Sequence, residues 1–209
     1  LLKVRDLGVA FTGPQGLVPV VEGVNLEIGR GERHALVGES GSGKSVTAQA
    51  LMRLHPDALV SGSVRFDGID VTAASPAELR GLRGRRIAMI FQEPMSALNP
   101  LYSVGDQISE VLVVHQAERR DSARSKAVAL LDRCGIRDPG QRYDSFPHQL
   151  SGGQRQRAMI AMALACDPDL VIADEPTTAL DVTVQARIMA LLRELQDERG
   201  MAILLITHD

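Results

Sequence analysis

The chain has 209 residues, of which 23 are Lys or Arg and 26 are Asp or Glu, so its formal net charge is −3. This balance argues against a domain that binds nucleic acid through a basic surface, and we expect no nucleic-acid partner. Apolar residues make up 44% and charged residues 23% of the chain, which excludes disordered and low-complexity classes.

The longest uninterrupted apolar run covers residues 158–166, well below the roughly 20 residues of a membrane-spanning helix. The sequence therefore predicts a chain that does not cross a bilayer, although it can bind a protein that does. It begins with Leu1 and shows no signal-peptide pattern, so we expect a piece of a longer protein. Cys134 and Cys166 stand far apart, which favours buried, reduced thiols.

The first part of the chain is predicted to be mainly β-structure, because apolar residues alternate there. The predicted strands are residues 2–4, 24–28, 33–37, 61–66 and 86–91. A loop containing Gly and Pro is expected at residues 12–19. Helical spacing follows a Gly-rich turn, over residues 44–54. The clustered Arg80, Arg83, Arg85 and Arg86 are expected to form a solvated face.

The second part is predicted to be mainly helical up to residue 150 and then to alternate. The predicted helices are residues 104–115, 122–134, 154–166 and 181–199, and the predicted strands are 170–173 and 201–207. Alternating strands and helices indicate an α/β fold with a parallel sheet. We expect a core formed by residues 1–92 and 151–209, and a helical subdomain formed by residues 93–150.

One motif binds phosphate in many proteins. Residues 38–45 read GESGSGKS, which matches the pattern G-x-x-x-x-G-K-[ST], and they lie between a predicted strand and a predicted helix. Glycines let successive N–H groups face a phosphate, the Lys adds a positive charge, and the Ser hydroxyl can bind Mg²⁺. The predicted phosphate-binding residues are Gly38, Glu39, Ser40, Gly41, Ser42, Gly43, Lys44 and Ser45.

A pair of carboxylates follows the apolar strand 170–173. Ligands of α/β sheets bind at the carboxyl ends of the strands, so Asp174 and Glu175 are expected at that edge. Asp174 is predicted to hold Mg²⁺, and Glu175 to polarise an attacking water as a general base.

The sequence Leu150-Ser151-Gly152-Gly153-Gln154 opens the predicted helix 154–166. Together with the two motifs above, it resembles the signature of the ATP-binding-cassette (ABC) ATPases, in the order found in that family. The resemblance implies a P-loop fold with a parallel sheet, an N-terminal antiparallel β part and a helical subdomain. It also implies that Ser151, Gly152, Gly153 and Gln154 contact the ATP of a partner cassette, so that ATP drives dimerisation.

Further roles follow from the same resemblance. Phe11 stands where the family stacks an aromatic ring on adenine, and Gln92 resembles the glutamine that contacts Mg²⁺ and the γ-phosphate. The metal ligands are thus expected to be Ser45, Gln92 and Asp174. Asp181 resembles the D-loop aspartate and His208 the switch histidine, which would act with Glu175 in catalysis. Val46 replaces a common Thr but keeps an N–H for phosphate.

Residues 91–100, 147–149 and 173–181 resemble the oligopeptide, dipeptide and nickel importer subfamily. This implies an ATP- and Mg²⁺-dependent ATPase on the cytoplasmic face of the inner or plasma membrane. Its partners would be a second cassette, identical or paralogous, transmembrane permease subunits and, indirectly, an extracytoplasmic solute-binding protein. Family members usually continue beyond the residue that corresponds to Asp209.

Two other functions remain open from the sequence. One is an ABC ATPase that acts on DNA or ribosomes, although the short spacing between Lys44 and Ser151, without a heptad repeat, argues against the repair type. The other is a non-catalytic nucleotide-binding cassette, against which the presence of both Glu175 and His208 argues. The transported solute, whether peptide, nickel, glutathione or opine, is not determined by these residues.

Overall fold

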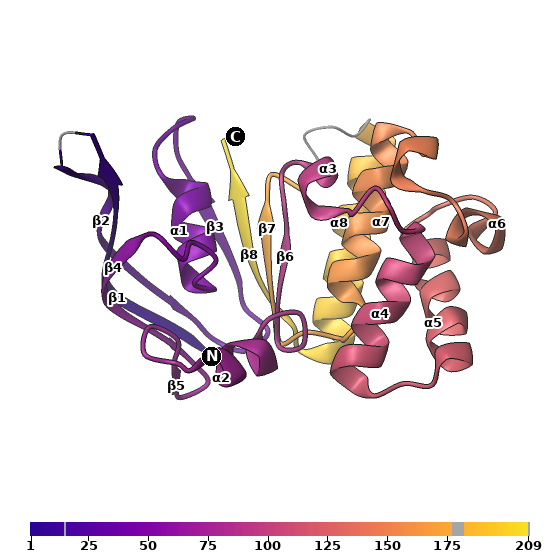
Figure 1. Cartoon of the computed structure of the whole chain (residues 1–209), viewed down its shortest axis with the longest axis horizontal. Helices are drawn as coiled ribbons and strands as arrows, with labels where there is room; N and C mark the ends of the chain where they lie inside the picture. Colours follow the sequence, from indigo (N-terminus) through magenta and orange to yellow (C-terminus); the bar gives the residue numbers. More distant parts are fainter. Residues whose placement is uncertain (15, 177–181, 209) are drawn as a thin grey trace.

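The computed structural model describes residues 1–14, 16–176 and 182–208. An antiparallel sheet, a parallel sheet and a group of helices stand side by side, with helix α1 between the two sheets (Figure 1). This is the predicted α/β architecture with an antiparallel N-terminal part. Among the residues described, no helix combines the length and the apolar character that a membrane span requires.

The antiparallel sheet has the strand order β2-β1-β4-β5. Its strands are β1 (Leu2–Gly13), β2 (Gly16–Ile28), β4 (Leu59–Phe66) and β5 (Ile69–Asp70). The loop predicted at residues 12–19 is wrong, since Phe11, Thr12 and Gly13 pair with Val18, Leu17 and Gly16 in a hairpin. Pro19 is accommodated because β2 is an edge strand, where a missing N–H costs little.

The parallel sheet has the strand order β3-β8-β7-β6. Its strands are β3 (Arg33–Val37), β6 (Ile87–Ile90), β7 (Leu170–Asp174) and β8 (Ala202–Thr207), close to the predicted ranges. Every residue of β6 and β7 is buried, as expected for strands covered on both faces. The order places the strand before the phosphate motif and the strand before the carboxylate pair on either side of β8.

The helices confirm most predicted positions and add short ones. They are α1 (Lys44–Leu51), α2 (Pro76–Leu82), α3 (Pro94–Ala97), α4 (Val104–Gln116), α5 (Arg120–Arg133), α6 (Pro139–Tyr143), α7 (Gly152–Leu164) and α8 (Val182–Arg199), with a 3-10 turn at Pro147–Gln149. Helix α2 was not predicted, although Ser75 and Glu78 form a capping box at its start. That S-P-A-E sequence is a recognisable helix-start signal.

Two apolar cores lie on opposite faces of the parallel sheet. Along β7, Val171 and Ala173 pack with α4, α5, α7 and α8, whereas Leu170 and Ile172 pack with α1 and the antiparallel sheet. This alternation follows from the period of two in a strand. Cys134 is fully buried in the first core, and burial raises the pKa of its thiol to about 12, as expected for an inert, apolar cysteine.

The cluster of four arginines is only partly a solvated face. Arg80 and Arg85 are exposed. Arg83 donates to the carbonyls of Met52 and Arg53, at 2.9 and 2.5 Å. Arg86 donates to two carboxylates, those of Asp67 (2.6 Å) and Asp169 (2.7 Å), and its guanidinium lies over the Phe66 ring. Arg83 therefore ties α2 to the end of α1, and Arg86 joins the segments next to the two sheets at the edge opposite the phosphate motif.

Gly62 occupies a backbone position that no other residue fits. Its φ is +80°, and a Cβ there would lie 2.2 Å from the backbone oxygen of Asp6, where the β1–β4 register shifts. Neither strand can move away without breaking the sheet. We therefore expect Gly62→Ala to lower the free energy of unfolding by roughly 2–4 kcal/mol, measured by urea denaturation.

The matched control is Gly81→Ala in α2, where an added Cβ meets nothing within 4 Å. Because alanine favours a helix over glycine, this variant is expected to gain up to about 1 kcal/mol. Equal stability of the two variants would contradict the argument from the Gly62 backbone.

Candidate functional site

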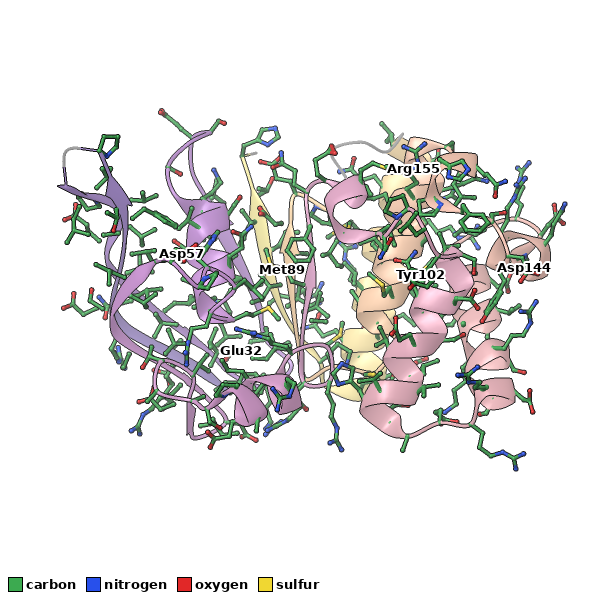
Figure 2. All side chains as sticks on the ribbon, viewed as in Figure 1. Glu32, Asp57, Met89, Tyr102, Asp144 and Arg155 are labelled. Atoms are coloured by element: carbon green, nitrogen blue, oxygen red, sulfur yellow. The ribbon has the colours of Figure 1, made fainter. Side chains whose placement is uncertain are left out.

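The predicted site residues gather at one edge of the parallel sheet. Parallel strands direct their carboxyl ends to the same side, and this edge lies at the top of Figure 1. Lys44 follows β3, Gln92 follows β6, Asp174 ends β7 and His208 follows β8. Figure 2 shows Glu32, which precedes β3, near the opposite edge. Lys44 and His208, which are 164 positions apart in the sequence, thus lie at the same edge because of the sheet topology.

The phosphate motif forms the turn between β3 and α1. Residues 39–42 are exposed, whereas Lys44 is 9% exposed. The Lys44 ammonium donates to two carbonyls of its own loop, those of Gly38 (2.6 Å) and Glu39 (2.7 Å). A buried ammonium group that donates to neutral carbonyl oxygens attracts an anion. The loop is therefore suited to a phosphate.

Gly43 sets the start of helix α1. It caps the helix with φ +86°, and a Cβ on it would lie 2.8 Å from the carbonyl oxygen of Val20 in β2. Gly43 has no side chain that could cap the first N–H groups of this helix, so these donors and the positive end of the helix dipole face the loop. Such a helix end favours phosphate binding.

Asp174 lies beside the phosphate motif and is 3% exposed. Burial raises the pKa of this carboxyl, and the charge of Glu175 raises it further, while the Ser45 hydroxyl and the charge of Lys44 lower it. Its Oδ1 atom is buried and has no hydrogen-bond partner in the described part of the chain. A buried carboxylate oxygen without a donor, next to a serine hydroxyl, suits a hard cation.

Glu175 joins three strand ends. Its carboxylate accepts a hydrogen bond from the amide of Gln92 (3.1 Å) and lies 3.3 Å from the Nδ1 atom of His208. The Glu175 side chain is 17% exposed, whereas that of His208 is 50% exposed. The structure thus brings together Gln92, Glu175 and His208, which were expected to act on the metal, the attacking water and the γ-phosphate. This arrangement leaves the carboxylate accessible to a water molecule from the open edge.

The signature residues lie at the start of α7, on the other face of the sheet from α1 (Figure 1). Ser151 caps the helix, since its hydroxyl accepts from the Gln154 N–H (3.3 Å) and the Gln154 side chain accepts from the Ser151 N–H (2.9 Å). Ser151 and Gly152 are exposed and Gly153 is half-buried. An exposed helix start on the other face of the sheet from the phosphate loop of its own chain suits a ligand held by another molecule.

The remaining candidates occupy different surroundings. Phe11 lies on β1 half-buried, with its ring edge-to-face against His55 at a centroid distance of 5.3 Å. Val46 is half-buried in the first turn of α1. Asp181, the predicted D-loop residue, lies outside the described residues. A hollow of about 360 Å³ lies elsewhere, over β1, β2 and β4, and it is lined by none of the predicted site residues.

One residue near the site was missed by the sequence analysis. Gln156, in the second turn of α7, is 1% exposed and donates to the carbonyl of Pro176 (2.7 Å), directly after Glu175. Its spacing from Met159 and Ile160 places it on the buried face of the helix. A polar residue at such a position is a usable signal, because a buried amide needs a partner.

The comparisons with known proteins agree with this geometry. The family model "ABC transporter" matches residues 21–178. The chain is 55% identical over 212 residues to the ABC transporter ATP-binding protein YejF of Escherichia coli (strain K12), covering 100% of this chain and 40% of YejF. It is 49% identical to the dipeptide transport ATP-binding protein DppD of Bacillus subtilis (strain 168), covering 100% of this chain and 63% of DppD.

Among solved structures, the dimeric post-hydrolysis state of the ATP-binding cassette MJ0796, bound to ADP and Pi, superposes with a TM-score of 0.91 at 31% identity. The match covers 100% of this chain and 88% of that one. The chain spans between two fifths and two thirds of the length of the two relatives named above. The family match, the identity and the superposition agree with the order of motifs, and the chain belongs to the ABC transporter family.

Proposed function

We propose that this chain binds ATP with Mg²⁺ at the carboxyl edge of the parallel sheet and hydrolyses the ATP. The observation that carries the proposal is the convergence of Lys44, Asp174 and the Gln92–Glu175–His208 cluster at that edge. Lys44 would leave the two loop carbonyls for the β- and γ-phosphates, and the loop N–H groups would bind the same oxygens. Phe11 would stack on the adenine ring.

The metal would be held mainly by phosphate oxygens. Among the described residues there is no group of three His, Cys, Asp or Glu side chains that would hold a metal, and Mg²⁺ at such sites is typically bound by one or two carboxylates together with phosphates and water. Asp174 fits this role through its unpartnered Oδ1, with Ser45 and Gln92 as further ligands. The ion would neutralise charge on the phosphates during the reaction.

Glu175 would act as the general base toward the attacking water. Its side chain accepts a hydrogen bond from Gln92 and lies beside His208, so the carboxylate is already oriented before substrate binds. The exposed imidazole of His208 would contact the γ-phosphate, where negative charge must be stabilised. Neither the role of Glu175 nor that of His208 requires a covalent intermediate.

A second cassette would complete each site. The exposed signature of one chain, formed by Ser151, Gly152, Gly153 and Gln154, would bind the γ-phosphate presented by its partner, with Asp181 at the dimer interface. Support comes from the position of α7 across the sheet from the phosphate loop, and from the dimeric structure of MJ0796. ATP would thus hold the dimer together, and hydrolysis would release it.

The assembly would power an importer. DppD is a dipeptide transport protein and OppD of Bacillus subtilis (strain 168) an oligopeptide transport protein, at 49% and 50% identity. We infer that the chain works at the cytoplasmic face of the membrane with permease subunits and, indirectly, with a solute-binding protein for peptides. Residues 93–150 would form the helical subdomain that, with Gln92, connects the site to the permease.

Removal of the Lys44 charge tests the nucleotide site. In the full-length protein, Lys44→Ala is expected to weaken ATP–Mg²⁺ binding by on the order of 100-fold, equal to about 2.7 kcal/mol, measured by isothermal titration calorimetry. The control is Lys3→Ala, which removes an exposed lysine paired with Glu27; its affinity should match that of the unmodified protein. Equal affinities of all three proteins, or no binding at all by the unmodified protein, would overturn the proposed function.

A further inference from the structure

We propose that Gln156 is a positioning residue for ATP hydrolysis: it holds the backbone next to Glu175 and links it to the signature at the start of α7. The inference rests on the proposed function, in which Glu175 is the general base. Gln156 does not reach the reacting atoms. It acts through the carbonyl of Pro176, the residue after Glu175.

The contact itself is buried and specific. Gln156 is 1% exposed, and its amide nitrogen donates to the Pro176 carbonyl at 2.7 Å. Its Oε1 atom is buried and makes no hydrogen bond within the described ranges. Burying an amide whose carbonyl oxygen has no donor costs free energy. An apolar side chain of similar size would avoid that cost but would leave the Pro176 carbonyl without this donor, so the glutamine is explained by the carbonyl that it holds.

The backbone that Gln156 holds is strained. Glu175 has a φ of +44°, a left-handed conformation that is unfavourable for a residue with a side chain. Such a conformation persists only where the surroundings fix it from several sides. The Glu175 N–H donates to the Ile206 carbonyl of β8 (3.1 Å). The carbonyl of the following residue, Pro176, accepts from Gln156. The strained residue is therefore fixed by β8 on one side and by α7 on the other.

Helix α7 also carries the signature. Ser151 caps its first turn, and Gln156 lies in the second turn of the same 13-residue helix. Because a helix moves as a rigid unit over this distance, a shift of its start on binding the partner's ATP is transmitted to the Pro176 carbonyl. Through Gln156, the binding of the partner's ATP to the signature of this chain would change the position of Glu175 in this chain's own site.

The chain offers a closely matched control. Gln196 in α8 is also buried (7% exposed) and has an unpartnered Oε1 within the described ranges. Its amide likewise donates to a backbone carbonyl, that of Gly31. Gly31 precedes β3, at the opposite edge of the sheet from Glu175. The two glutamines therefore share burial and bonding and differ in what they hold.

The experiment compares Gln156→Met with Gln196→Met in the full-length protein. Both are expected to lower the melting temperature by similar amounts. Only Gln156→Met is expected to lower kcat for ATP hydrolysis, on the order of tenfold to 100-fold, with KM for ATP within twofold. ATP-bound dimers of this variant should also persist longer, as measured by light scattering after dilution of ATP. Gln156→Asn, too short to reach Pro176, should act in the same direction if the Met variant does not fold.

Equal kcat losses in the two Met variants, or an unchanged kcat in Gln156→Met, would overturn the inference. A loss confined to KM and melting temperature would assign Gln156 a structural role only and overturn it as well. Absence of hydrolysis by the unmodified protein is a separate result, since it would overturn the proposed function and this inference with it.

Discussion

Replacement of Glu175 with Gln is expected to lower kcat for ATP hydrolysis by on the order of 10²–10⁴-fold, the usual contribution of a general base. The amide keeps the size of the carboxylate and its carbonyl oxygen still accepts from Gln92, so ATP affinity should stay within about twofold. Because bound ATP is then not consumed, the dimer formed across the signature should accumulate. Light scattering with and without ATP–Mg²⁺ measures its mass.

The control is Glu22→Gln, which changes an exposed carboxylate on β2 away from the site and should turn over ATP at the unmodified rate. An unchanged kcat in Glu175→Gln would show that another group activates the water. A slow variant that stays monomeric with ATP would indicate that the natural partner is a different cassette. Adding that neighbouring cassette should then restore the dimer.

Strands β6 and β7 were predictable from the sequence because they are runs of apolar residues that face both sides of the sheet. β6 and β7 are runs of four or five buried residues, and such runs are distinctive. The hairpin of β1 and β2 was missed in part because Gly13, Gly16 and Pro19 carry loop preferences. Pairing with β1 outweighs those preferences, and sequence alone does not show a pairing across a sheet edge.

The residues that gather at this edge could be named from sequence motifs, but the contacts between them could not. Lys44 and Asp174 follow from local motifs, whereas the contact of Gln92 with Glu175 depends on β6 lying next to β7. Nor do local patterns show the left-handed backbone of Glu175, because no glycine marks it. The strain is imposed from outside, by β8 and α7, and only the tertiary structure reveals it.

The buried carboxylate of Asp174 is expected to lower the stability of the nucleotide-free protein and to bind Mg²⁺ when nucleotide is present. A carboxylate buried beside Glu175 is unfavourable without a cation, and its raised pKa expresses that cost. We therefore expect Asp174→Asn to raise the melting temperature of the nucleotide-free protein, by about 2–4 °C for each kcal/mol released. The same variant should lose at least about 10- to 100-fold in Mg²⁺ affinity, and with it Mg²⁺-dependent hydrolysis.

The pH dependence of the free energy of unfolding distinguishes the removal of a buried charge in Asp174→Asn from a simple change in side-chain packing. Since the folded protein holds the Asp174 proton more tightly than the unfolded chain, its free energy of unfolding falls as the pH rises from the ordinary pKa of 3.8 through the raised value. The stability difference between Asp174→Asn and the unmodified protein should thus be smallest below about pH 4 and widen toward neutral pH. Carboxyls common to both proteins cancel in this difference, which urea denaturation at several pH values measures.

Asp67 provides a control of opposite sign. Hydrogen bonds from Arg86 and Arg30 lower the pKa of its carboxyl, so its contribution to stability is present above the ordinary pKa and is lost as the pH falls through the lowered value. Asp67→Asn should therefore destabilise the protein at neutral pH, and this loss should shrink in acid. If Asp174→Asn instead behaved like Asp67→Asn, the buried carboxylate would be stabilised by its surroundings without a metal. Its assignment as a Mg²⁺ ligand would then lose its physical basis.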